Sequence, residues 1–159
     1  MTPDFQRVLT HYIDGGWADA NRSSDDDKFE RGRPRSAYLL LTSCGMVIQP
    51  RSEVQVTTRC YRPFRAHKMV VAEDSARFDL TDLKVGFRSQ LTQALPIPLR
   101  GCAGHVRGHR EEVQPTPICW PLEVCAYGAE VSARAIIAAG REEDPGAEFE
   151  IVLLGEAVF

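Results

Sequence analysis

The sequence predicts an all-β protein: an antiparallel β-sandwich of jelly-roll-like type, preceded by a short N-terminal helix and a linker arm. Two observations favour this fold class. Short alternating or apolar segments recur between turn residues, and no long helical pattern separates them, as a parallel α/β sheet would require. The chain has 159 residues, 43 % hydrophobic and 26 % charged, which is typical of one globular domain. We assign residues 1–36 to the helix and flexible arm and residues 37–159 to the sandwich.

The first segment, residues 2–13, has the pattern of a short amphipathic helix. Asp4 is a suitable N-cap, and Phe5, Leu9 and Tyr12 recur at helical spacing. Because about three turns are too few for a helix to be stable alone, we expect it to dock on its own domain or on a neighbouring copy.

Residues 14–36 are predicted to be a linker. They contain few aliphatic side chains, a pair of glycines and a run of three aspartates, a composition that does not build a core. A random coil of this size spans roughly 25 Å, which is enough to place the helix on an adjacent protomer.

The sandwich is predicted from period-two alternation and short apolar runs. Pro121 predicts that residues 118–124 form an edge strand or two short pieces. Residues 131–140 are the ambiguous segment, since their alanines favour a helix whereas their β-branched residues and flanking turn signals favour a strand, and we predict a strand. The candidate strands are residues 38–49, 53–60, 68–72, 77–86, 118–124, 130–138 and 148–159.

Charge and hydropathy exclude several partners. The net charge of −3 argues against a nucleic-acid footprint over the whole domain. Arg31, Arg33 and Arg35 resemble an AT-hook, which binds the minor groove of DNA, but the aspartates at 25–27 oppose phosphate binding, so we expect no nucleic-acid partner. No apolar run approaches the ~18–20 residues of a membrane span and no secretory signal is recognisable. We expect no membrane partner and a cytoplasmic location, or one in a virion-like particle assembled in the cytoplasm.

The residues best suited to bind a metal are Cys102, His105 and His109, whose sulfur and imidazole groups are zinc ligands at short spacing. Arg107 and Arg110 lie in the same glycine-rich segment and oppose a cation. We therefore predict no metal and no cofactor. The odd number of cysteines, five, indicates reduced thiols in a cytosolic compartment. Since the chain has no G-x-S-x-G elbow and no phosphate-binding glycine loop, we predict that it is not an enzyme.

Several short motifs resemble one family. Arg62-Pro63-Phe64-Arg65 precedes an aliphatic run, residues 78–86 form a Phe-x-Leu-x-Asp-Leu-x-Val-Gly strand followed by Ser89-Gln90, and the last strand contains Gly155-Glu156-Ala157-Val158. This pattern, over about a third of the chain, is similar to small β-sandwich structural proteins of tailed phages and related particles, of the capsid or decoration type. The resemblance implies a non-enzymatic structural protein that forms a symmetric homo-oligomer or decorates a larger shell, with copies of itself and other particle proteins as partners.

Aromatic and arginine side chains are the residue types enriched at protein interfaces, and two groups of them are candidates for such contacts. Two alternative functions remain open. One is a sandwich that binds carbohydrate or peptide through Trp17, Trp120 or Tyr127, and the other is a cupin-like metal-binding domain that uses His105 and His109. The candidate interface residues are Arg59, Tyr61, Arg62, Phe64 and Arg65, together with Phe5, Leu9 and Tyr12 of the predicted helix.

Overall fold

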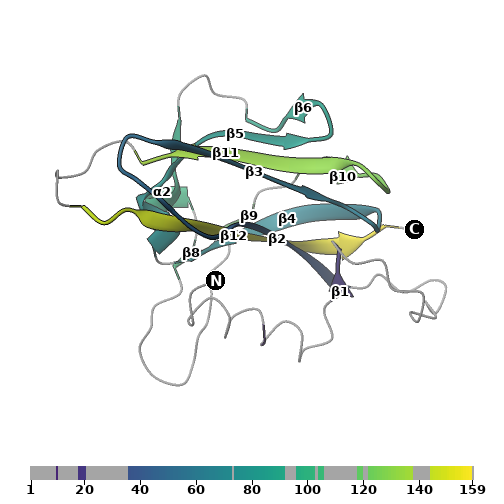
Figure 1. Ribbon diagram of the computed structural model, residues 1–159. Helices are drawn as coiled ribbons and strands as arrows, with labels where there is room; N and C mark the ends of the chain where they lie inside the picture. The colour runs from purple at the N-terminus through teal and green to yellow at the C-terminus, as the bar shows by residue number, and fades with distance from the viewer. Residues whose placement is uncertain are drawn as a thin grey trace.

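The protein folds into two β-sheets that pack face to face, as a computed structural model shows (Figure 1). The strands of each sheet are mainly antiparallel, so the all-β prediction is confirmed. The structure describes residues 10, 18–20, 36–72, 74–91, 96–102, 104–105, 118–119, 122–137 and 144–158.

The larger sheet has the strand order β1-β2-β12-β4-β10, and β8 and β9 also pair with β4. The two long strands β2 and β12 are antiparallel neighbours at its centre, whereas β1 and β8 join it in parallel. Its strands are β1 (Ala18–Asp19), β2 (Ser36–Ile48), β4 (Phe64–Val71), β8 (Gly104–His105), β9 (Ile118–Cys119), β10 (Val124–Cys125) and β12 (Ala147–Ala157).

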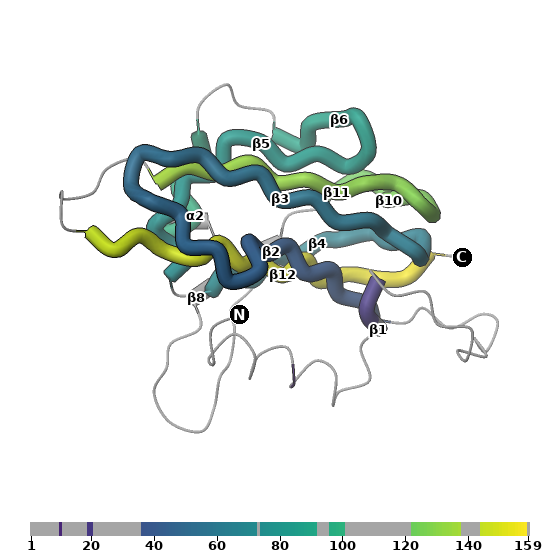
Figure 2. The backbone as a smooth tube through the Cα atoms, in the orientation of Figure 1, coloured from purple at the N-terminus to yellow at the C-terminus, as the bar shows by residue number. Residues whose placement is uncertain are grey.

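The smaller sheet has the order β3-β11-β5-β6, with β7 also paired to β5. Figure 2 shows β3, β5, β6 and β11 as the second layer above β2, β12 and β4. Its strands are β3 (Glu53–Arg59), β5 (Asp79–Val85), β6 (Arg88–Ser89), β7 (Ile97–Pro98) and β11 (Glu130–Ile136), and two single-turn helices, η1 (Asp74–Arg77) and α2 (Leu99–Cys102), connect strands.

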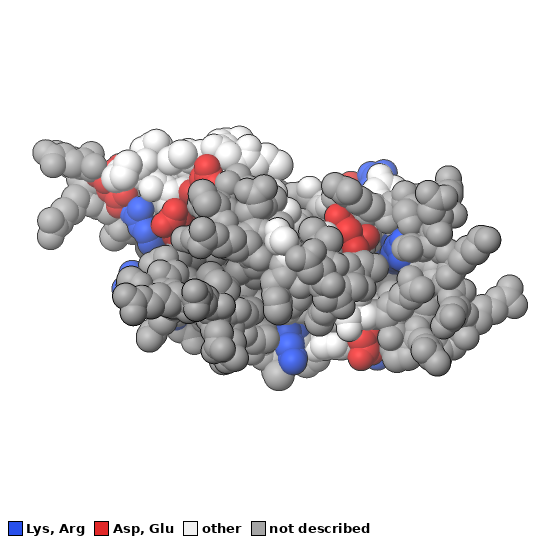
Figure 3. All heavy atoms as spheres, turned by 90° about the horizontal axis from the view of Figure 1, so that it is seen from below, with Lys and Arg blue, Asp and Glu red and all other residues white. Residues whose placement is uncertain are grey.

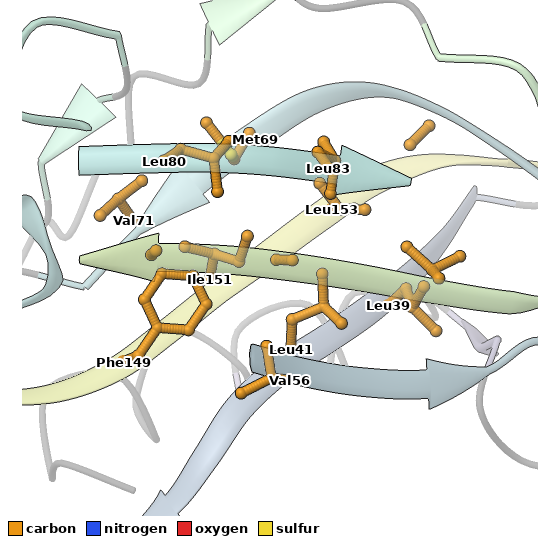
Figure 4. Close-up of a cluster of buried hydrophobic side chains, with 14 of the residues drawn as sticks. Leu39, Leu41, Val56, Met69, Val71, Leu80, Leu83, Phe149, Ile151 and Leu153 are labelled. Carbon is orange, nitrogen blue, oxygen red and sulfur yellow. The ribbon is translucent and has the colours of Figure 1, made fainter. Parts of the chain in front are cut away.

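The core lies between the two layers and contains side chains from both (Figure 4). In β3 and β11 the alternate residues are buried, because successive side chains of a strand point to opposite faces. Phe149 of β12 packs edge-to-face on Phe78, with 5.2 Å between ring centroids. The labelled core residues in Figure 4 are Leu39, Leu41, Val56, Met69, Val71, Leu80, Leu83, Phe149, Ile151 and Leu153.

Two buried serines satisfy the backbone of β12 where its neighbour β2 bulges, with residues 43–46 of β2 opposite the single residue Phe149. The register of β12 against β2 shifts between Glu148 and Glu150. The Ser75 hydroxyl donates to the Glu148 carbonyl (3.0 Å) and accepts from the Glu150 amide (2.7 Å). Ser43 of β2 accepts a hydrogen bond from the Phe149 amide (3.1 Å). Buried backbone groups need partners, so these hydroxyls replace the hydrogen bonds that the ladder loses at a bulge.

Gly155 allows β12 to approach β4 closely. A Cβ atom at this position would overlap the Arg65 carbonyl oxygen, and the register of the two strands shifts between Leu154 and Gly155. The glycine of the Gly-Glu-Ala-Val motif therefore has a steric reason to be there.

The ambiguous and proline-containing segments are settled by the structure. Residues 130–136 form strand β11, so the helical alternative for this segment is wrong. Residues 118–124 contain two short pieces, β9 and the first residue of β10, as Pro121 predicts.

Two sequence-based boundaries differ from the observed ones. The predicted strand 68–72 begins earlier, at Phe64, because residues 64–67 also alternate between buried and more exposed positions although three of them are polar or small. The predicted linker contains β1, and Ala20 after it is fully buried. The predicted helix at residues 2–13 lies, apart from Thr10, outside the described residues, so it stays a prediction.

Candidate interaction surface

Three chain connections meet at one end of the molecule: β3 to β4, β5 to β6, and β10 to β11. The Gly128 amide donates to the Cys60 carbonyl (2.6 Å), and the Cys60 amide donates to the Ala129 carbonyl (2.9 Å). The Gly86 amide donates to the Glu130 carbonyl (2.7 Å). These hydrogen bonds hold the three connections together, so side chains from distant parts of the sequence share one surface.

Exposed aromatic side chains gather on this surface. Tyr61 is 37 % exposed, Tyr127 is 68 % exposed and Phe87 is completely exposed. The rings of Tyr61 and Tyr127 contact each other edge-to-face, with centroids 6.4 Å apart. None of these rings completes the core, so their apolar area is available for contacts with another molecule.

A cross-strand ion pair lies beside the aromatic rings. Arg59 of β3 is opposite Glu130 of β11, and their guanidinium and carboxylate groups are 3.1 Å apart with about half of each side chain exposed. Such a pair contributes little to stability, and it places a positive and a negative group side by side at this end. We call the surface formed by Arg59, Tyr61, Phe87, Tyr127 and Glu130 the aromatic end.

The structure separates the predicted interface residues into two groups. Arg59, Tyr61 and Arg65 are exposed or partly exposed, whereas Phe64 is 2 % and Arg62 8 % exposed. Phe64 belongs to the core and has almost no surface to offer a partner. The interface itself stays a prediction, and the helix residues Phe5, Leu9 and Tyr12 lie outside the described residues.

Sequence reasoning missed Phe87 and Glu130 and treated Tyr127 only as a ligand-binding aromatic. Phe87 lies in the tight turn after Gly86, which has a φ of +61°. An aromatic residue directly after a turn glycine, between two alternating segments, is a signal that was available in the sequence. Nothing local marks Glu130, because its position opposite Arg59 depends on strand register.

The charged side chains visible in Figure 3 are mixed in sign, with Lys and Arg lying beside Asp and Glu at several places. Arg88 pairs with Glu123 and Arg134 with Glu53, each at 3.3 Å. The segment with Arg31, Arg33 and Arg35 lies outside the part that the structure describes.

The structure does not place the candidate metal ligands Cys102, His105 and His109 together in the part of the chain that it describes. Cys102 ends α2 and His105 ends β8, while His109 falls outside the described ranges. Within the described part of the chain, no group of three or more His, Cys, Asp or Glu side chains is placed to hold a metal ion. Over the same residues, no helix is long and apolar enough to cross a membrane.

Three described cysteines are free thiols: Cys44 is exposed, whereas Cys60 and Cys125 are buried. Cys60 follows β3 and Cys125 ends β10, so the two buried thiols come from different sheets. Beneath the aromatic end, the Cys60 amide and the Cys125 thiol both donate to the Ala129 carbonyl oxygen.

Comparison with known proteins does not assign the chain to a family. No family model matches the chain, and neither the curated proteins nor the solved structures contain a significant match.

Proposed function

We propose that the protein is a non-enzymatic structural protein that self-assembles into a symmetric oligomer or decorates a larger shell, and that the aromatic end is its contact surface. In this proposal the chain acts in the cytoplasm or in a virion-like particle assembled there. Its partners are copies of itself and other particle proteins, and the two sheets form a jelly-roll-like sandwich.

The observation that carries the proposal is the composition of the aromatic end. Tyrosine and arginine are the residues most often found at energetic hot spots of interfaces, and here both types accompany the fully exposed Phe87 on one surface. The core is complete without them. Their exposure therefore needs a reason other than folding.

The geometry also lowers the entropy lost on association. The Tyr61 and Tyr127 rings already restrict each other, and Arg59 is held by Glu130. A partner that binds here immobilises fewer free rotamers than one that binds isolated side chains. A preorganised surface of this kind suits a permanent contact between subunits.

The test is the native mass of the full chain, measured by light scattering over a range of concentrations, for wild type and for the double variant Phe87→Ser/Tyr127→Ser. We expect a discrete multimer for wild type and a smaller species for the double variant. Because a hot-spot residue contributes about 2 kcal/mol or more, dissociation should become at least ~30-fold easier. Both side chains are largely in solvent, so the fold should survive, which circular dichroism checks.

The matched control is Met46→Ser. Met46 is also an exposed apolar residue, at 62 %. Val47 beside it pairs with Glu148 of β12 whereas Tyr38 pairs with Leu154, so Met46 lies roughly 20 Å along the sheet from Tyr38. Tyr38 is at the aromatic end through Ala20 and Tyr61. This variant should keep the wild-type mass. A wild-type chain that stays monomeric at every concentration, also when mixed with an assembled shell, would contradict the proposal.

A second candidate function rests on the same tyrosine pair. Exposed aromatic rings also stack on sugars and peptides, so a monomeric chain that loses carbohydrate or peptide binding on Tyr127→Ser would be a ligand-binding module. That result would replace the structural role.

A further inference from the structure

Two cysteines that are 65 positions apart in the sequence meet in the core between the two sheets. Cys60 directly follows β3 of the smaller sheet, and Cys125 is the last residue of β10 in the larger sheet. Their exposed fractions are 0 % and 2 %. Both belong to the hydrophobic core cluster.

One backbone oxygen brings the two residues into contact. The Ala129 carbonyl oxygen accepts the Cys60 amide hydrogen at 2.9 Å and also the Cys125 thiol, whose Sγ is 3.6 Å away. The two thiols are also close enough for each to shift the pKa of the other. A disulfide requires ~4.4–6.8 Å between Cα atoms, a separation that is open to two residues that share one hydrogen-bond acceptor.

We infer that Cys60 and Cys125 are a redox-active dithiol, which a small-molecule disulfide oxidises to an intrachain disulfide that joins the two sheets. This inference does not depend on the proposed assembly function.

Cys125 is the thiol that reacts first. The hydrogen bond from Cys60 lowers the pKa of Cys125, whereas the hydrogen bond with Cys125 and burial raise the pKa of Cys60. The two thiols therefore titrate as a coupled pair, in which the Cys60 S–H favours a thiolate on Cys125. Cys125 is also the easier of the two to reach, because β10 is a two-residue strand at the end of its sheet and such edges open locally.

The reaction is two successive thiol–disulfide exchanges. The Cys125 thiolate attacks one sulfur of oxidised glutathione, the glutathione S–S bond breaks, and the departing glutathione takes up the proton that Cys125 lost. Cys60 then loses its proton and attacks the Cys125 sulfur, which releases the second glutathione as a thiol. Two electrons pass from the cysteine pair to the oxidant, and the chain loses two hydrogen atoms.

Cys44 provides an internal control. It is an exposed thiol in β2 with a φ of 54°. Tyr38 pairs with Leu154 of β12 and Thr42 with Glu150, so Cys44, which follows Thr42, lies about 13 Å or more along the sheet from Tyr38. Tyr38 is next to the loop of Cys60 through Ala20 and Tyr61. It is therefore too far from Cys60 and Cys125 to join them in one folded chain.

The experiment equilibrates the folded full-length chain with mixtures of oxidised and reduced glutathione, quenches with acid, alkylates free thiols in denaturant and maps the peptides. We expect oxidised protein to have two fewer alkylated cysteines than reduced protein and to contain a peptide pair joined through Cys60 and Cys125, reversed by dithiothreitol. The variant Cys44→Ser should behave identically. Cys60→Ser should instead trap a glutathione adduct on Cys125.

Three results would overturn the inference. One is full alkylation of Cys60 and Cys125 in every oxidising mixture, another is pairing of either residue with Cys44, Cys102 or Cys119, and the third is a lasting glutathione adduct on Cys125 of the wild type. If Cys60→Ser does not fold, the wild-type peptide map decides alone. Since the readout is a mapped bond, it is separate from the native-mass test of assembly.

Discussion

Replacing Ser75 with alanine tests whether the backbone of β12, opposite the bulge of β2, depends on a side-chain hydroxyl. Ser75 is fully buried in the short helix η1. Its hydroxyl makes hydrogen bonds with the Glu148 carbonyl and the Glu150 amide, on either side of the register shift. The substitution Ser75→Ala removes one oxygen atom and leaves the rest of the packing unchanged.

The expected loss of stability follows from those two contacts. A buried amide deprived of its acceptor costs about 1–3 kcal/mol, and a carbonyl, which has two lone pairs, costs less. We therefore expect Ser75→Ala to lower the free energy of unfolding by about 2–3 kcal/mol. With a urea m-value of about 2 kcal/mol/M, the unfolding midpoint should fall by about 1–1.5 M.

The matched control for this prediction is Ser89→Ala. The Ser89 hydroxyl also makes two hydrogen bonds, to the Asp82 carboxylate (2.7 Å) and from the Leu91 amide (3.3 Å), but it is exposed. Water replaces those contacts, so the change should stay within about 0.5 kcal/mol. Equal midpoints for the two variants would refute the argument that buried hydroxyls support the bulge.

Two glycine substitutions, one in β12 and one in the β5-to-β6 connection, separate a steric clash from the cost of a positive φ. Gly155→Ala should lower the free energy of unfolding, measured by urea titration, by about 3 kcal/mol, which is the upper end of the range for overpacked cores. At Gly86 only the positive φ opposes alanine, so Gly86→Ala should lower the free energy of unfolding by about 1–2 kcal/mol. Equal losses for the two variants would contradict a steric clash at Gly155.

The Gly146 amide and Arg77 lower the pKa of Asp144. The Asp144 carboxylate therefore stabilises the folded protein at pH values above its unfolded pKa of about 3.9. This contribution is lost as the pH falls through the lower pKa that Asp144 has in the folded protein. The urea midpoint of wild type should exceed that of Asp144→Asn at neutral pH, and the difference should disappear in acid. A difference that does not change with pH would contradict this role of Asp144.

The strands with alternating apolar and polar residues were the part of the fold that the sequence predicted best. In residues 53–59 and 130–136 every second side chain is apolar or small, and both segments are strands with one buried face. The Arg-Pro-Phe-Arg motif was harder to interpret, because arginines on both sides of Phe64 suggested a surface loop. Phe64 starts β4 and is buried, whereas Arg65 is exposed. This is the same alternation of buried and exposed residues as in β3 and β11.

The candidate surface was only partly predictable, because it depends on contacts between distant segments. Arg59 and Tyr61 were expected from their residue types. The placement of Phe87 and Tyr127 at the same end depends on hydrogen bonds from Gly86 to Glu130 and from Gly128 to Cys60, and local sequence does not determine these. The same holds for Cys60 and Cys125, whose contact across the two sheets no spacing rule indicates.

The end of β12 has a practical consequence for experiments on this molecule. The Val158 amide donates to the Pro63 carbonyl (2.7 Å), so the last described residue is fixed two positions from Tyr61, near the end marked C in Figure 1. An affinity tag or fluorescent fusion appended there would stand beside the tyrosine rings and shield them. Purification handles are therefore better placed elsewhere or removed by protease before masses are compared.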